Sequence, residues 1–258
     1  MQEQHQGTRI ILRGTIICIV ESMPLLKYLV EAGFGARRQS VAAIKQGRVS
    51  VNGRVVESYT MPVYPKIDNV TCDGKPVKFR PPDMLVFMLN KPLNVLSTTH
   101  DEWGRKTVID LLPERYRSLG LYPAGRLDYD STGLLILTND GNLTYRLTHP
   151  RFEHEKEYIV TVSGRLSEAD KEKLEKGIEL EDGRTSPTVI REIPDAACTY
   201  SITLHEGRHR QVKRMFAFIG HEVKTLKRIR IGRLELGDLP EGEIRKLTRA
   251  EIGKLLRG

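Results

Sequence analysis

Apolar residues recur at helical spacing in two short stretches near the start of the chain. The first stretch predicts a helix that ends at Gly33. A second helix is expected to begin with Ser40 as its N-cap, because a serine hydroxyl can accept a hydrogen bond from a free backbone N–H, and to end at Gly47. The apolar residues of the two stretches are Leu25, Leu26, Leu29, Val30, Val41, Ala42 and Ile44.

The pattern then changes to the alternation of a β-hairpin. Residues 48–56 alternate around the Asn-Gly pair at 52–53, which favours the tight turn of a hairpin. An Asp-Gly pair at 73–74 indicates a second short hairpin. Residues 79–83 contain two adjacent prolines, which disfavour both helix and central strand, so we interpret them as a linker. Residues 23–80 are therefore expected to form a small domain of two helices and a hairpin.

Beyond the linker, strand-like runs are separated by two candidate helices and long loops. Strands and helices do not alternate regularly, which indicates an α+β fold with a mixed sheet rather than βαβ winding. The helices are expected at residues 167–176 and 208–219, and the strands at residues 85–89, 134–138, 158–162, 199–205 and 223–231.

The first 22 residues give an ambiguous pattern. They contain two apolar runs, but Arg13 and Gly14 separate the runs and Glu21 ends the second. A signal peptide would need a longer apolar centre and a small-residue cleavage site. Because Met23 opens a segment that fits a protein start better, we interpret residues 1–22 as an N-terminal extension with no role in the chemistry.

Composition limits the classes of protein to consider. Hydrophobic residues make up 39% and charged residues 29% of the 258, which argues against a disordered chain. No apolar run approaches the roughly 18 residues of a membrane-spanning helix. The three cysteines are scattered without the spacing of a disulfide framework or a zinc knuckle, so we expect a cytoplasmic location and no metal site.

Positive charge gathers in two parts of the chain. The net charge is +8, yet residues 23–80 hold ten basic and four acidic residues and residues 205–233 hold nine and two. The remainder is acidic on balance. Two basic patches on such a body indicate two surfaces that meet one polyanion, with solvated helix faces as the alternative.

The densest polar segment spans residues 124–133. Asp128, Asp130 and Thr132 look like the first half of a calcium loop, but the twelfth position of such a loop is a glutamate and here is Asn139. Asp-x-Asp-x-Thr also suggests a magnesium phosphatase nucleophile, but such a motif would be expected to follow a buried strand, whereas Pro123, Gly125 and Arg126 precede it here. A polar turn whose carboxylates cap local N–H groups is a further alternative.

The small N-terminal unit carries a known pattern. Its segment GARRQSVAAIKQGRVSVNGRVV resembles the alpha-L RNA-binding domain of small-subunit ribosomal protein S-four. Four basic residues near the junction of its helices and hairpin form the expected RNA-binding ridge: Arg37, Arg38, Lys45 and Arg48.

Four segments of the remaining chain occur in a fitting order. They are GRLDYDSTGLLILTNDG, LTHPRFEHEKEYIVTVSG, EGRHRQVKRMFAFIGHEV and IGRLELGDLPEGEIRKLT. Together they resemble the RsuA-type pseudouridine synthases, bacterial enzymes that isomerise uridine in ribosomal RNA. The resemblance implies a mixed-sheet catalytic domain at residues 84–258 that needs no cofactor and no metal.

The resemblance makes Asp128, in Gly-Arg-Leu-Asp, the catalytic aspartate. Conversion of uridine to its C-glycoside breaks N1–C1′, turns the uracil and forms C5–C1′ without net redox change or hydrolysis. A carboxylate can act in this reaction as a nucleophile or a base while the loose ring stays caged. Attack on the sugar, addition to C6 and removal of a sugar proton all remain open.

The resemblance also assigns roles to three other residues. Tyr158 is expected to lie against the target uracil and take part in C5 proton transfer; a core tyrosine is the alternative. Arg126 is expected to enter the space that the target base vacates, or to contact phosphate. Lys213 aligns with the basic residue that pairs with the catalytic aspartate in the family, whereas spacing alone makes it a helix-flank lysine.

The expected partner is ribosomal RNA or a ribosomal assembly intermediate, bound by a monomer that does not enter a membrane. The alternative function is a non-catalytic ribosome-binding or assembly factor on the same scaffold. The intact catalytic set favours the enzyme, because a pure binder would be free to lose it. In the second basic patch, the residues expected to contact RNA are Arg208, Arg210 and Arg214.

Overall fold

The computed structural model of the chain describes residues 8–13, 16–79 and 83–256. Two predicted segments lie partly outside these ranges: the N-terminal extension at residues 1–7 and 14–15, and the linker at residues 80–82. None of the helices described is long and apolar enough to cross a membrane.

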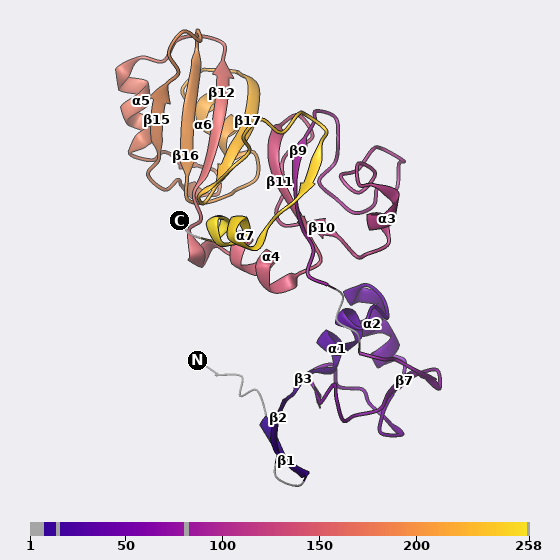
Figure 1. The fold of residues 1–258 in the computed structure, drawn as a ribbon. Helices are drawn as coiled ribbons and strands as arrows, with labels where there is room; N and C mark the ends of the chain where they lie inside the picture. Colours follow the sequence, from indigo (N-terminus) through magenta and orange to yellow (C-terminus); the bar gives the residue numbers. More distant parts are fainter. Residues whose placement is uncertain (1–7, 14–15, 80–82, 257–258) are drawn as a thin grey trace. The chain divides into compact units, whose positions relative to one another are not determined.

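The chain divides into two compact units, residues 1–83 and residues 84–258 (Figure 1). One hydrophobic cluster forms the core of the first unit, and two clusters lie in the second. Each unit therefore has its own apolar interior.

Two short helices form in the first unit as predicted: α1 (Leu25–Glu31) and α2 (Arg37–Lys45). The predicted N-cap of the second helix is wrong. The N-cap is Ala36, and Ser40 lies inside the helix, fully buried, where its hydroxyl donates to the carbonyl of Gly35 at 3.5 Å. Ser40 faces the core, so its hydroxyl is not available to cap the first turn.

Short antiparallel strands complete the first unit. Their bounds are β1 (Thr8–Arg13), β2 (Ile16–Glu21), β3 (Met23–Pro24), β4 (Val49–Val51), β5 (Arg54–Val55), β6 (Pro62–Val63), β7 (Val70–Cys72) and β8 (Lys75–Pro76). Strand β1 pairs with β2 and β3 with β6, while β5-β4-β7-β8 form one sheet. The β4–β5 and β7–β8 pairs confirm the hairpins predicted at Asn-Gly and Asp-Gly.

A nine-stranded mixed sheet organises the second unit, which confirms the predicted α+β class. Its strands are β9 (Val86–Lys91), β10 (Tyr122–Pro123), β11 (Thr132–Thr138), β12 (Lys156–Val162), β15 (Val189–Glu192), β16 (Thr199–Leu204), β17 (Val223–Ile231), β18 (Leu234–Glu235) and β19 (Ile244–Lys246). The main order is β15-β16-β12-β17-β11-β9-β19, with β10 beside β11 and β18 beside β17. Strands β11 and β17 pair in parallel, and the other neighbouring strands of this sheet pair antiparallel.

Helices and one hairpin surround this sheet. They are α3 (Glu114–Arg117), α4 (Gly141–Thr148), the 3₁₀ turn η1 (Pro150–Phe152), α5 (Glu168–Glu175), α6 (Gln211–Phe218), α7 (Arg249–Leu255) and the hairpin β13 (Glu179–Leu180) with β14 (Gly183–Arg184). Helices α5 and α6 were predicted, whereas α3, α4 and α7 were not.

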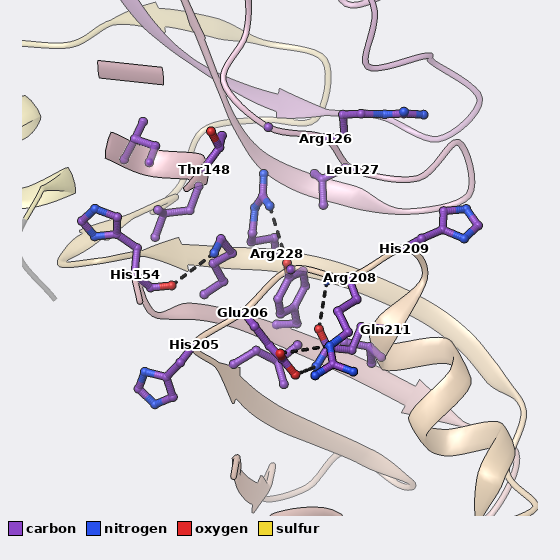
Figure 2. A pocket seen from close by; sticks show the side chains of 18 of the residues that line it. Arg126, Leu127, Thr148, His154, His205, Glu206, Arg208, His209, Gln211 and Arg228 are labelled. Carbon is purple, nitrogen blue, oxygen red and sulfur yellow. Dashed lines mark hydrogen bonds and ion pairs between the residues drawn. The ribbon is translucent and has the colours of Figure 1, made fainter. Parts of the chain in front are cut away.

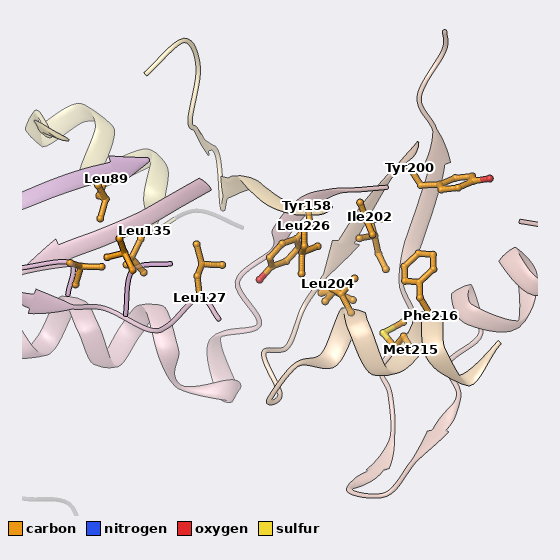
Figure 3. Packing of buried hydrophobic residues seen from close by; sticks show 14 of the residues in the cluster. Leu89, Leu127, Leu135, Tyr158, Tyr200, Ile202, Leu204, Met215, Phe216 and Leu226 are labelled. Atoms are coloured by element: carbon orange, nitrogen blue, oxygen red, sulfur yellow. The ribbon is translucent and has the colours of Figure 1, made fainter. Parts of the chain in front are cut away.

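The sheet is buried on both faces in its centre, which explains the continuous apolar run of β11. Alternate residues of a strand point to opposite faces. Leu135 and Leu137 join the cluster that includes α6, while Leu134 and Ile136 join the cluster that includes α4 and α7. Figure 3 shows Tyr158 in the first of these clusters, on the side where α6 packs.

A close crossing of β11 and β17 fixes the geometry beside the loop that precedes β11. Gly133 pairs with Arg228 in parallel, and a Cβ on Gly133 would lie only 2.2 Å from the Arg228 carbonyl oxygen. Its φ of +103° is also unfavourable for residues with a side chain. The glycine therefore allows the loop to approach the middle of β17.

Candidate active site

A pocket of about 420 Å³ lies in the second unit where five segments meet (Figure 2). The segments are the loop before β11, the end of α4, the start of β12, the turn before α6 and strand β17. Its volume is in the range of small-molecule sites.

Asp128 lines this pocket on a loop whose backbone is fixed on both sides. The Ser97 hydroxyl donates to the Leu127 carbonyl at 2.8 Å and accepts from the Leu127 N–H at 3.1 Å. The Lys91 ammonium donates to the Ser131 carbonyl at 2.8 Å, and the Ser131 N–H donates to the Asp128 carbonyl at 3.1 Å. Polar contacts thus fix the backbone from which the Asp128 side chain extends at the pocket wall.

Lys91 brings a fully buried positive charge behind this loop. Its ammonium donates to the carbonyls of Pro92 and Ser131, both at 2.8 Å. Burial lowers the pKa of Lys91 to about 8, although the carboxylates of Asp128 and Asp130 act in the opposite direction. The charge of Lys91 is therefore coupled to that of Asp128.

Lys213 pairs with Asp130 rather than with Asp128, which corrects the expected ion pair. The Lys213 ammonium lies 2.5 Å from an Asp130 carboxylate oxygen, and the Arg210 guanidinium contacts the same carboxylate at 3.2 Å. Burial raises the pKa of Asp130, but the two cations outweigh burial and the pKa is lowered. Asp130 is on the α6 side of the loop, so its side chain reaches Lys213 and Arg210.

Tyr158 contributes its ring to the pocket and its hydroxyl to a buried contact. The residue lies on β12 and is 8% exposed. Arg228 donates a long hydrogen bond of 3.5 Å from Nη1 to the Tyr158 hydroxyl, and its Nε donates to the Leu134 carbonyl at 2.7 Å. Arg228 itself lines the pocket and is 3% exposed.

Lys156 adds a second cation to the same wall. It precedes Tyr158 by two residues in β12, so both side chains lie on one side of the strand. Its ammonium donates to the His154 carbonyl at 3.2 Å. Burial and the charge of Arg228 lower the pKa of Lys156 to about 8.

The sequence pattern did not indicate Lys91, Lys156 or Arg228 as site residues. The two-residue spacing from Tyr158 is a signal that could have found Lys156. Arg228 lies in a strand with three other basic residues, Lys224, Lys227 and Arg230, a composition equally typical of a solvated strand. Lys91 follows an apolar run, and only its three-dimensional surroundings show that it is buried.

The remaining predicted residues of this unit lie around the pocket. Arg126 is exposed on the pocket rim. Arg208 donates to Glu206 at 3.0 Å and to the Gly183 carbonyl at 2.7 Å, and Arg214 pairs with Asp182 at 2.8 Å. These contacts hold the β13–β14 hairpin near α6, and RNA binding by Arg208 and Arg214 stays a prediction.

The basic residues predicted in the first unit are exposed. Arg37, Arg38 and Lys45 lie on α2, and Arg48 follows it. The Arg48 guanidinium donates to the Asp73 carboxylate at 2.9 Å. Their contact with RNA stays a prediction, and Arg48 already has a protein partner.

The pocket thus brings the carboxylate of Asp128 together with the ring of Tyr158 and several cations, and Glu153 and Glu206 also line it. Within the described parts of the chain, no group of three or more His, Cys, Asp and Glu side chains is placed to hold a metal ion. A carboxylate beside an aromatic platform suits acid–base or nucleophilic chemistry on a flat polar ring.

Comparisons with known proteins identify the family. The model of the family described as RNA pseudouridylate synthase matches residues 85–218, and the S4 domain model matches residues 23–65. A pseudouridylate synthase crystal structure is 35% identical with a TM-score of 0.65, and the match covers 91% of this chain and all of that one.

Full-length relatives agree with these matches. An uncharacterized RNA pseudouridine synthase from Aquifex aeolicus is 44% identical, with 90% of this chain and 92% of the relative covered. The ribosomal large subunit pseudouridine synthase B of Bacillus subtilis is 40% identical, with 90% and 94% covered. The chain therefore belongs to the RNA pseudouridine synthase family, and it joins that catalytic domain to an S4 domain.

Proposed function

We propose that this enzyme converts a uridine of ribosomal RNA to pseudouridine and that Asp128 is its catalytic carboxylate. The observation that carries the proposal is the position of Asp128, on a backbone fixed by buried hydrogen bonds and in one pocket with Tyr158. Precise placement of a reacting group accounts for a large part of enzymatic rate enhancement.

Ribosomal RNA is the proposed substrate class for two reasons. One relative with 40% identity is named a ribosomal large subunit pseudouridine synthase. The S4 domain lies within residues 23–80, whose net charge of +6 favours binding to a polyanion. A cytoplasmic location and action as a monomer belong to the same proposal.

The reaction needs no atoms from outside the substrate. The N1–C1′ bond breaks, the uracil turns, C5 bonds to C1′, and the proton lost from C5 is balanced by one gained at N1. Asp128 acts on the sugar or the ring as a nucleophile or base, and the pocket holds the loose ring.

Tyr158 and Arg126 have complementary proposed roles. The target nucleotide must leave its stack, which costs a few kcal/mol. The buried ring of Tyr158 offers a surface on which the uracil can stack. Arg126 is exposed on the rim, where its side chain can fill the space that the base leaves or contact a phosphate.

A tritium-release assay tests this function. Unmodified ribosomal RNA labelled with tritium at C5 of uridine loses label to water when C5 bonds to C1′. We expect release that reaches a plateau at about one site per RNA molecule. Binding of the RNA without release would contradict the enzymatic function and favour a non-catalytic ribosome-binding factor.

A further inference from the structure

The buried guanidinium of Arg228 is only partly satisfied by hydrogen bonds within the protein. Its Nε donates to the Leu134 carbonyl and its Nη1 to the Tyr158 hydroxyl, while the buried Nη2 has no hydrogen-bond partner. A buried charge without partners costs free energy. The close packing of Gly133 on the Arg228 backbone holds the residue in this position.

Lys156 also faces the pocket without a dedicated counterion. The carboxylates on either side of it in the sequence, Glu155 and Glu157, both bind Arg230 at 2.8 Å. The carboxylate that acts on Lys156 is Glu206.

Glu206 is itself committed to other partners. It accepts from Arg208 at 3.0 Å, from the Gln211 side-chain amide at 2.6 Å and from the Ser186 N–H at 3.1 Å. The positive charge of Lys156 is therefore only partly compensated. In Figure 2 Glu206 is joined to Arg208 and Gln211, and Arg228 points toward the space between them and Arg126.

Two like charges on one wall make the pocket suited to a negative group. Arg228 and Lys156 repel each other, and this repulsion adds to burial in lowering the pKa of Lys156. That pKa of about 8 still leaves Lys156 mostly protonated at pH 7. An anion in the pocket would relieve the repulsion and satisfy the free Nη2 of Arg228.

The burial of Arg228 indicates which kind of anion can bind to it. The residue is 3% exposed, so a phosphate on the RNA backbone, which stays at the protein surface, cannot reach it. A base that has left its stack can enter the pocket. When N1–C1′ breaks, its electron pair stays on the uracil, and the charge spreads from N1 to O2 and O4.

We propose that Arg228 and Lys156 are catalytic residues that bind the detached uracil and hold the negative charge on its ring. The proposal rests on the proposed function. The electron pair of the broken N1–C1′ bond stays on the ring, and a pair from the ring then forms C5–C1′. The C5 proton leaves, N1 gains a proton, and the two cations keep their own protons throughout. Fixed charges aimed at developing charge are an effective form of catalysis.

Lys156→Met provides the test, because its partly exposed side chain is not part of the hydrophobic cores. We expect the single-turnover rate of uridine isomerisation to fall on the order of 10²-fold, with the RNA Kd changed less than about twofold. Lys156→Arg should recover at least part of the rate. The matched control is Lys227→Met, which removes an exposed charge from β17 beside Arg228 and should leave the rate within about twofold.

A substrate with a better leaving group separates charge stabilisation from a structural role. Fluorine at C5 withdraws electrons, so a 5-fluorouracil ring needs less help to carry the charge. The N1–C1′ bond must break with either ring, so loss of the N-glycoside can be compared between the two substrates. It is measured by chromatography of nuclease digests. The deficit of Lys156→Met should shrink to less than about tenfold on this substrate. Arg228→Lys should show the same trend if its unfolding transition matches that of the wild type.

The outcomes are distinct. An equal deficit on both substrates, or no deficit on uridine, overturns the role of Lys156 and Arg228. Failure of the wild type to release tritium from uridine would instead overturn the proposed function.

Discussion

Asp128 and Asp130 lie two residues apart on one loop and have different partners. Asp130 is half exposed and binds Lys213 and Arg210, whereas Asp128 lines the pocket and acts on the buried Lys91. The sequence pointed to Asp128 through the Gly-Arg-Leu-Asp pattern. It could not show which carboxylate Lys213 reaches, because that depends on the direction of each side chain along an irregular loop.

The Lys213–Asp130 pair should contribute to stability as a coupled unit. In a double-mutant cycle of Lys213→Met and Asp130→Asn, we expect a coupling free energy of about 0.5–1 kcal/mol in urea unfolding, modest because Asp130 is half exposed. The cycle of Lys213→Met with Asp128→Asn should give a smaller coupling. If the larger coupling were with Asp128, the assignment of the ion pair would be wrong.

Lys91 should make the free energy of unfolding depend on pH in the alkaline range. Its pKa is about 8 in the folded protein and ordinarily 10.5, so the unfolded chain holds more protons between these values and stability contributed by Lys91 rises with pH. Relative to Lys91→Met, the free energy of unfolding of the wild type should increase by up to about 1.4 kcal/mol per pH unit in this window. Urea titrations from pH 7 to 10 measure the difference, and a difference independent of pH would show that Lys91 is not desolvated.

At the scale of elements, the crossing of β11 and β17 brings the Asp128 loop to Arg228. Long periodic runs such as β12, β17 and α6 could be predicted, because their apolar spacing is set by burial on one face. The short strands β10, β18 and β19 could not be predicted, because two or three residues are too few to show a periodic pattern of apolar positions. Helices α4 and α7 follow turn residues in segments that were notable for their family motifs, and no helix was predicted there from apolar spacing.

Gly133→Ala should break this crossing. A Cβ 2.2 Å from the Arg228 carbonyl forces the backbones apart, and the positive φ adds strain, so we expect a loss of about 3–4 kcal/mol in unfolding free energy. Gly220→Ala is the matched control, because Gly220 also has a positive φ but its Cβ would meet no atom within 4 Å. The control should lose only about 1 kcal/mol. Equal losses would show that the contact with Arg228 is unimportant.

At the scale of the whole molecule, the chain combines a basic RNA-binding unit with a catalytic unit. Both functions could be predicted because contiguous segments of each unit resemble a known family: residues 35–56 in the first unit, and the Gly-Arg-Leu-Asp segment with three later segments in the second. The pair of cations at the pocket wall could not be predicted, because Lys156 and Arg228 lie on strands that become neighbours only in the folded sheet.

The exposed cations of α2 should bind RNA phosphates. Replacing Arg37, Arg38 and Lys45 by Gln in the full chain should flatten the slope of log K against log salt by about 2, since each single-strand contact contributes about 0.7. The control replaces Lys66, Lys75 and Lys78, which are also exposed in the first unit. It removes the same charge and should change the slope by less than about 0.7. Equal changes would mean that α2 is not a specific RNA-binding surface.

Loss of catalysis without loss of binding is the most direct test of the central claim, which is that Asp128 carries out the isomerisation. Asp128→Asn keeps the size and hydrogen bonding of the side chain but removes its charge. In single-turnover tritium release from C5-labelled ribosomal RNA, we expect the rate to fall at least about 10³-fold while the Kd for the same RNA stays within about threefold. Release by Asp128→Asn within tenfold of the wild-type rate would contradict the account.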